Sequence, residues 1–296
     1  MNIAVGMIIF NGNYVLRECL ESIYPYASQI LISEGPVKYW QEQGYTTSTD
    51  GTNDILDNFP DPDNKIKIVH GQFDEKDDQC NAYMQYLNDD ADYIWNIDCD
   101  EIFKSEDIEK LIEILKKERP TSVGFKSCSF YGGFHDSMGG FEENVEFMRI
   151  RKVYPGSYWA THRPPTIAHK MRLDAWSEKH LDHNTLYNNY RIKMYHYSYV
   201  FPDQVYQKIN YYKTKISKDN AIDNYFDEVY LPWVLNQNRN LIEQKYLGVH
   251  EFKPQYRGEC YTKPFTDTHP DAIIKNMTEL MSKFDSQLEK YLCTNT

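Results

Sequence analysis

The chain has 296 residues, enough to bury one large core or two smaller ones, and its apolar and charged fractions are typical of a globular protein. Its net charge of −12 argues against a nucleic-acid backbone as the main partner, although a nucleotide bound through a metal remains compatible with it. The six cysteines form no Cys-x-x-Cys pair, which predicts reduced usage rather than a disulfide framework or a zinc site.

The start of the chain lacks the basic and apolar pattern of a signal peptide, and no run of about 18 apolar residues occurs. We therefore expect a cytoplasmic protein without a transmembrane segment, and peripheral contact with a membrane stays open. The sequence gives no sign of the oligomeric state.

The first hundred residues alternate between apolar runs and amphipathic segments. Strands are predicted at 3–10, 29–33, 65–70 and 93–97, and helices at 15–23, 53–58 and 79–87. This βαβ order predicts an α/β fold with a mostly parallel sheet. Neither a G-x-G-x-x-G loop nor a Walker A loop follows the first strand, so the usual glycine-rich phosphate loops are absent.

The second part of the chain is less regular. A helix is predicted to start at Ser105, and further strands at 121–131, 146–153 and 191–200, while 170–190 has no clear pattern. After residue 200 the predicted elements are helices, at 204–216, 227–246 (with a break near Pro232) and 273–292. We expect a domain of residues 1–200 followed by a C-terminal helical region, 201–296.

Two acids end the predicted strand at 93–97. Asp98 and Asp100 share one face of the extended chain, whereas Cys99 points to the other. Two carboxylates repel each other unless a cation lies between them, and hard divalent cations prefer oxygen ligands. A metal site and a simple strand-end turn are both open on this evidence, because the same spacing occurs at 61–63 and 90–92, which read as solvated turns.

The ordered series of features is more specific than any one of them. It comprises the βαβ start without glycine-rich loops, the acid Glu34 after the second strand, the run 49–52 (TDGT), the run 78–81 (DQCN) and the run 98–101 (DCDE). Over roughly residues 1–200 this series resembles a glycosyltransferase of the GT-A fold, similar to glycosyltransferase family 2. The resemblance implies a Rossmann-like, mixed and mostly parallel sheet flanked by helices, here with the C-terminal helical extension.

The family also implies a nucleotide-sugar donor held with Mn²⁺ or Mg²⁺. Carried over by position, the donor-binding residues are Phe10, Asn11, Glu34, Asp78, Gln79, Asn81 and Asp98. The implied metal ligands are Asp98, Asp100 and His196. A UDP-sugar is the first choice for the donor and a GDP-sugar the second.

Three departures from the family pattern affect these assignments. The segment 37–48 interrupts the usual compact loop after the second strand, Cys80 stands where relatives often carry Arg, and His162 is followed by Arg163 where some relatives have Glu. His162 is therefore predicted to touch the donor or the acceptor, without an adjoining acid.

An inverting transferase needs a general base, usually a carboxylate, to deprotonate the acceptor hydroxyl. The acids considered are Glu142, Glu143, Asp174, Glu178 and Asp182. Asp174 and Asp182 are preferred, because the acceptor loop of this fold lies late in the domain, and with His162 they are the predicted catalytic residues.

The predicted enzyme moves a hexosyl or pentosyl group from a nucleotide-sugar to a hydroxyl of a glycan, a lipid-linked sugar or a glycoprotein, and the resemblance favours inversion. One alternative is a nucleotidyltransferase, although the turn 11–13 is neither long nor basic as that class requires. The other is a carbohydrate- or nucleotide-sugar-binding protein of the same fold without turnover.

Overall fold

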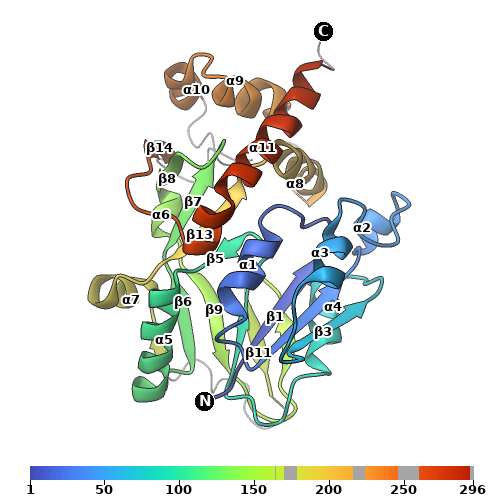
Figure 1. The fold of residues 1–296 in the computed structure, drawn as a ribbon, viewed down its shortest axis with the longest axis vertical. Coiled ribbons are helices and arrows are strands. Elements are labelled where there is room, and N and C mark those ends of the chain that lie inside the picture. Colours follow the sequence, from blue (N-terminus) through green and yellow to red (C-terminus); the bar gives the residue numbers. More distant parts are fainter. Residues whose placement is uncertain (164, 170–178, 216–223, 246–259, 294–296) are drawn as a thin grey trace. The chain divides into compact units, whose positions relative to one another are not determined.

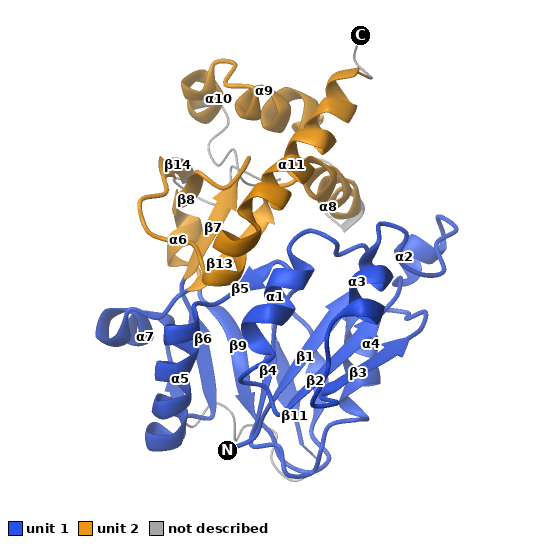
Figure 2. Ribbon diagram, viewed as in Figure 1, with its two compact units in different colours: residues 1–126, 146–193 blue, residues 127–145, 194–296 orange. Residues whose placement is uncertain are grey.

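We analysed a computed structural model of the chain, which describes residues 1–163, 165–169, 179–215, 224–245 and 260–293. The chain forms two compact units, each built from two separate stretches of sequence (Figure 2). Unit 1 comprises residues 1–126 and 146–193, and unit 2 comprises residues 127–145 and 194–296. The predicted division at residue 200 stays a prediction.

Unit 1 is built around a seven-stranded sheet with the strand order β12-β6-β9-β4-β1-β2-β3 (Figure 1). Its strands are β1 (Ile3–Ile9), β2 (Gln29–Glu34), β3 (Ile66–His70), β4 (Tyr93–Asn96), β6 (Ser122–Phe125), β9 (Phe147–Lys152) and β12 (His180–Leu181). Only β9 runs antiparallel to its neighbours within this sheet. The predicted α/β class, with a mixed and mostly parallel sheet, is confirmed.

Helices surround the sheet, as expected for parallel strands buried on both faces. They are α1 (Leu16–Ile23), α2 (Lys38–Gln41), α3 (Thr52–Asn58), α4 (Lys76–Met84), α5 (Ser105–Glu118) and α7 (His183–Tyr190). Helix α4 begins three residues before the predicted start at 79, because Asp78 accepts a hydrogen bond from the backbone N–H of Glu75 and fixes the first turn earlier.

Helix α4 lies tightly against β1. The ring of Tyr83 is so close that a Cβ at Gly6 would lie 2.6 Å from it, so only glycine fits at this point of β1. Tyr83 belongs to a buried apolar cluster with Ala4, Ile94 and Trp159. Trp159 comes from the antiparallel hairpin of β10 (Tyr158–Thr161) and β11 (Thr166–Ala168), which the sequence analysis missed.

The predicted strand 121–131 is wrong as a single element. The segment forms two strands, β6 before Lys126 and β7 (Ser127–Tyr131) after it, which belong to different sheets and different units. An uninterrupted apolar and β-favouring run does not reveal a change of sheet, because both halves are buried strands.

Unit 2 has its own core, and its strands belong to a second sheet. Strand β7 pairs in parallel with β13 (Met194–Tyr199), and β8 (Asp136–Gly140) pairs antiparallel with β7 and with β14 (Cys260–Pro264). The helical elements are α6 (Phe141–Asn144), α8 (Pro202–Lys215), the π-helical turn η2 (Phe226–Tyr230), α9 (Leu231–Val234), α10 (Arg239–Lys245) and α11 (Asp271–Cys293). The predicted helical C-terminal region is thus present.

Aromatic side chains dominate the core of unit 2. Tyr131 packs edge-on against Trp233, with ring centroids 4.9 Å apart, and its hydroxyl lies 3.1 Å from that of Tyr225.

None of the described helices is both long enough and apolar enough to cross a bilayer.

Candidate functional site

The acidic segment after β4 lies at the carboxyl edge of the unit 1 sheet. Asp98 and Glu101 close a turn on each other: the N–H of Glu101 donates to the carbonyl of Asp98 at 3.0 Å, and the N–H of Asp98 donates to Oε2 of Glu101 at 3.2 Å. Asp100, within this turn, is largely buried. Because β4 lies next to the central strand β1, the turn occupies the edge at which open α/β sheets bind ligands.

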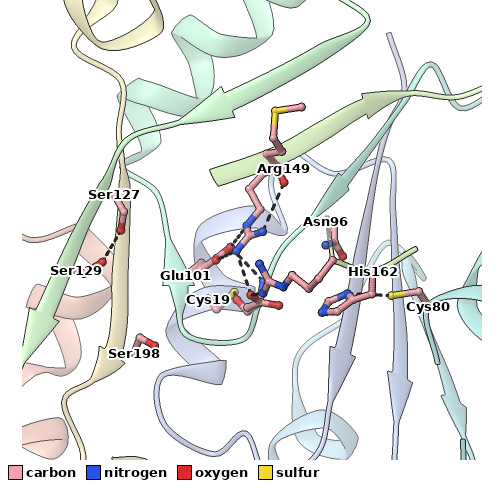
Figure 3. A network of polar contacts seen from close by, with 12 residues as sticks. Cys19, Cys80, Asn96, Glu101, Ser127, Ser129, Arg149, His162 and Ser198 are labelled. Carbon is pink, nitrogen blue, oxygen red and sulfur yellow. Dashed lines mark hydrogen bonds and ion pairs between the residues drawn. The ribbon is translucent and has the colours of Figure 1, made fainter. Parts of the chain in front are cut away.

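Arg149 supports the turn by its contacts with Glu101 and Asp98. This residue lies on β9, beside β4, and its guanidinium makes a two-pronged contact with Glu101, including Nε to Oε2 at 2.7 Å (Figure 3). The Arg149 and Glu101 side chains are only 1% and 0% exposed. Burial opposes the charged guanidinium, but Glu101 and Asp98 outweigh it and raise the pKa of Arg149. The pair is therefore a buried, charge-assisted support for the turn.

Asp98 is shared between two arginines. Its Oδ2 lies 3.1 Å from Nη2 of Arg149 and 3.1 Å from Nη2 of Arg163. Burial on its own would raise the pKa of Asp98, but Arg149 and then Arg163 hold it well below the usual range. The Asp98 carboxylate is therefore ionised throughout the physiological pH range.

His162 is buried against the N-terminal part of α4. Its backbone N–H donates to the carboxylate of Asp77, and its Nδ1 lies 3.6 Å from Sγ of Cys80 (Figure 3). Burial, and then the charge of Arg163, lower the pKa of His162 to about 3. The imidazole is thus neutral at pH 7 and carries no positive charge toward a ligand. The predicted catalytic role of His162 stays a prediction.

Three predicted donor-binding residues on α4 have protein partners. Gln79 is buried and donates from Nε2 to the carbonyls of Ile9, Ser33 and Gly35, at 3.0–3.2 Å. Asn81 makes a two-way clamp with the backbone of Trp159, with both contacts at 2.8 Å. These two amides fix α4 to the strand ends and to β10, whereas Asp78 bonds to the backbone N–H of Glu75 at the start of the helix. Their predicted contacts with a nucleotide stay predictions.

Glu34, at the end of β2, anchors the segment that leads into α3. Its carboxylate accepts from the N–H of Ser48 at 2.8 Å and from Oγ1 of Thr47 at 3.1 Å, and it contacts Nδ1 of His70 at 3.0 Å. Burial opposes the charge of Glu34, but these hydrogen bonds outweigh it and lower its pKa. The predicted ribose or base contact stays a prediction for a carboxylate that already has three partners.

Asn11 supports the same segment from the end of β1. It adopts the left-handed conformation, with φ of 49°, which asparagine tolerates better than most residues. Its Oδ1 accepts from the N–H of Thr49 at 2.8 Å, and its own N–H donates to Oγ of Ser48 at 2.8 Å. Asn11 and Glu34 together hold the 47–49 segment across two strand ends.

The inserted segment 37–48 adds aromatic rings beside Phe10. The ring centroid of Phe10 lies 5.5 Å from that of Trp40 and 5.4 Å from that of Tyr45. All three side chains are partly exposed. This partly exposed aromatic surface suits the flat face of a base or a sugar, in keeping with the predicted position of Phe10.

The remaining predicted site residues belong to other elements, and their predicted roles stay predictions. His196 lies on β13 in unit 2. Asp182 caps α7 and accepts from the backbone of Asn184 and Thr185; hydrogen bonds from Thr185 lower its pKa, which makes it a weak base. Of the other acids considered, Asp174 and Glu178 lie outside the described residues, while Glu142 and Glu143 lie on α6 of unit 2.

Asp98 and Asp100 fit a divalent cation that takes most of its ligands from phosphate and water. Mg²⁺ is commonly held by one or two carboxylates together with substrate phosphates. Glu101 is committed to Arg149, and no group of three or more His, Cys, Asp or Glu side chains suited to a metal occurs in the described ranges. An ion held at these two carboxylates would therefore need further oxygen ligands from a substrate or from water.

The sequence analysis missed both arginines of the site. Arg149 and Arg151 alternate with apolar residues in the 147–152 strand, and a strand that buries arginines requires acidic or carbonyl partners, which was the available signal. Arg163 was noted only as the residue that replaces a glutamate. Its pairing with Asp98 joins residues 65 positions apart and has no local signature.

Residues 46–167 match the family model described as Glycosyl transferase family 2. This match confirms the resemblance to family 2 glycosyltransferases that the sequence predicted, and it confirms the predicted enzyme class, a glycosyltransferase. The matched range includes the Asp98–Glu101 turn, Arg149 and Arg163. A search of curated proteins found no match.

Among solved structures, the chain is similar to S. aureus TarS 1-349, with 11% identity, a TM-score of 0.42 and coverage of 82% of this chain and 73% of the other. A complex of that protein with UDP-GlcNAc gives 12% identity, a TM-score of 0.42 and coverage of 82% and 74%. A 4-diphosphocytidyl-2C-methyl-D-erythritol synthase from Anaerococcus prevotii gives 15% identity, a TM-score of 0.33 and coverage of 51% and 70%. These likenesses are distant, and no residue assignment rests on them.

Proposed function

We propose that the chain transfers a sugar from a nucleotide-sugar donor to a hydroxyl acceptor, with inversion, and that a divalent cation held at Asp98 and Asp100 assists the reaction. The observation that carries this proposal is the rigid acidic turn at the carboxyl edge of the sheet, supported by the buried pair of Arg149 and Glu101. The family match to residues 46–167 supports the reaction class.

In this reaction the bond between the anomeric carbon and the diphosphate oxygen breaks, and the electron pair leaves with the diphosphate. Oxocarbenium character develops on the sugar, while negative charge builds on the leaving group. A bound divalent cation offsets that charge and orients the diphosphate. Asp100 is the proposed direct ligand and Asp98 the ligand nearer the ribose, as the family resemblance implies.

The base of the donor is proposed to lie against Phe10, Trp40 and Tyr45, next to the segment that Glu34 and Asn11 hold. A UDP-sugar is the first candidate for the donor. The proposed acceptor is a glycan or other glycoconjugate. The general base that deprotonates its hydroxyl is proposed to be either Asp174 or Asp182.

The test is a thermal-shift screen against UDP-, GDP-, dTDP- and CMP-sugars with and without Mn²⁺. Saturation at about 100 times the Kd adds about 2.7 kcal/mol of stability. We expect one nucleotide class to give a metal-dependent shift in the wild type, and we expect D100N to lose it. The matched control is D63N, which removes a carboxylate from an Asp-x-Asp pair that lies outside the proposed site.

Two results would count against the proposal in different ways. A shift that needs no metal and survives in both D98N and D100N would remove the metal assignment but keep the donor site. The absence of a shift with every donor at millimolar concentration would instead favour a protein of this fold without transferase activity.

A further inference from the structure

Arg163 is the exposed member of the charge network at Asp98. Its side chain is 53% exposed, and its Nη2 lies 3.1 Å from Oδ2 of Asp98, whose side chain is 24% exposed. Arg149 contacts the same oxygen but is 1% exposed and is committed to Glu101. Of these two arginines, only Arg163 can meet a ligand that arrives from solution without disturbing the core.

The backbone beside Arg163 is fixed. The N–H of His162 is held by Asp77, and the strand that precedes it is clamped by Asn81 through Trp159. These contacts tie the 159–163 stretch to α4, and the ion pair with Asp98 then orients the guanidinium at the acidic turn. A preorganised cation of this kind loses little conformational entropy when it binds.

Asp98 has cationic neighbours from three parts of unit 1. Lys76, at the start of α4, also acts electrostatically on Asp98, so Asp98 has cationic groups from α4, from β9 and from the segment after β10. A guanidinium offers parallel N–H donors with the spacing of phosphate oxygens, which an ammonium does not. Phosphate is therefore the ligand chemistry that fits Arg163.

We propose that Arg163 binds the diphosphate of the nucleotide donor and that Asp98 positions its guanidinium for this contact. This inference rests on the proposed function and adds Arg163, to which the proposed function gives no role. When the anomeric carbon–oxygen bond breaks, the electron pair goes to the diphosphate oxygen, and Arg163 donates hydrogen bonds to the charge that builds there. The new bond forms to the acceptor oxygen, whose proton goes to the carboxylate base.

The experiment compares R163Q with the wild type in titrations of UDP and of GDP with Mn²⁺, and of the nucleosides uridine and guanosine. Hydrogen bonds to charged groups contribute about 1.5–3 kcal/mol, so R163Q should weaken binding of the preferred diphosphate about 10- to 100-fold. Binding of the nucleoside should stay within about twofold, since the base contacts lie elsewhere. R163K keeps the positive charge but lacks the parallel N–H donors, so its affinity for the diphosphate should lie between those of the wild type and R163Q.

The matched control is R119Q, which removes the same charge from unit 1 at the end of α5. Pro120, its neighbour, accepts a hydrogen bond from Tyr93 at the start of β4, so this position lies at the opposite edge of the sheet from Asp98. R119Q should bind the diphosphate as the wild type does. The salt dependence of diphosphate binding should be shallower in R163Q than in R119Q.

The outcomes separate this inference from the function on which it rests. If the wild type binds the diphosphate with metal and R163Q binds it within about twofold, the role of Arg163 is overturned and the donor site stands. Equal losses for diphosphate and nucleoside would also overturn it, because they indicate a disturbed site. If the wild type binds neither UDP nor GDP, the role of Arg163 toward these diphosphates is overturned, whereas the proposed function is decided by the screen of all four donor classes.

Discussion

Two carboxylates end strands on either side of β1, and their surroundings differ. Glu34, after β2, is 1% exposed and is surrounded by uncharged donors and by His70, which hold the 47–49 segment. Asp98, after β4, is partly exposed and is held by two guanidiniums. Both acids were predicted to bind the donor from their similar positions at strand ends.

The comparison teaches that the position of an acid at a strand end does not fix its role. A carboxylate whose hydrogen bonds hold a loop stabilises the fold, and a ligand would have to displace those bonds at a cost. A carboxylate paired with an exposed arginine can exchange partners with little change in stability, because exposed ion pairs contribute little. The four changes below separate these roles.

The largest effect on stability is expected from R149M. It leaves Glu101 as a buried carboxylate without its guanidinium, and breaking a buried ion pair costs about 3–5 kcal/mol. Urea unfolding monitored by tryptophan fluorescence measures the loss. The double variant R149M/E101L removes both charges, so it should recover part of this loss. A single variant as stable as the wild type would show that the pair does not support the turn.

The next largest effect is expected from E34Q. The amide keeps the size of the side chain but replaces one acceptor oxygen by a donor, so part of the bonding to Ser48, Thr47 and His70 is lost. We expect a loss of about 1–3 kcal/mol in the free energy of unfolding. The matched change D98N should cost less than E34Q, since its amide keeps a carbonyl oxygen for Arg163 and Arg149 while Arg149 keeps its pair with Glu101. Equal losses in both variants would remove the distinction between the two acids.

Acid should weaken the fold through Glu34. Burial on its own would raise the pKa of Glu34, but the hydrogen bonds from His70, Ser48 and Thr47 outweigh burial and lower the pKa below the ordinary 4.5. The unfolded chain therefore binds the proton more tightly, so the stabilisation is complete above about pH 4.5 and is lost as the pH falls through the lower folded value. Unfolding free energies measured between pH 6 and pH 3 should fall less steeply in E34Q than in the wild type. Parallel curves would contradict this.

The smallest effect on stability is expected from R163Q. Its ion pair with Asp98 is half exposed, and such pairs contribute about 0–1 kcal/mol. Scanning calorimetry should give a Tm close to that of R119Q. A loss of several degrees would identify Arg163 as a structural partner of Asp98.

Much of the fold of unit 1 could be predicted from the sequence, because its strands and helices carry strong periodic signals. The predicted strands 3–10, 29–33 and 65–70 correspond to β1, β2 and β3 within a residue or two at each end. The hairpin of β10 and β11 could not be predicted in the same way. Its strands are short, and β10 is held by the clamp from Asn81, which no local pattern reveals.

The candidate site could be predicted only in part. The position of Asp98 and Asp100 after a buried strand was sufficient to place them at the edge of the sheet. The partners of these polar side chains could not be predicted, because they depend on tertiary distances. Examples are the hydrogen bonds from Gln79 to three backbone carbonyls and the guanidinium of Arg149 that Asp98 and Glu101 share. Several polar residues that the resemblance implied for donor binding, among them Gln79, Asn81 and Glu34, make hydrogen bonds within the protein.

The interleaved composition of the two units has a consequence for synthesis on the ribosome. Strand β7 pairs with β13, so residues 127–131 must wait until all of 146–193 has been translated before their partner emerges. In that interval Phe130 and Tyr131, which are fully buried in the finished protein, lack their covering strand. Nascent chains with such exposed apolar edges depend on chaperones, and a truncation at residue 193 should aggregate even though every segment of unit 1 is present.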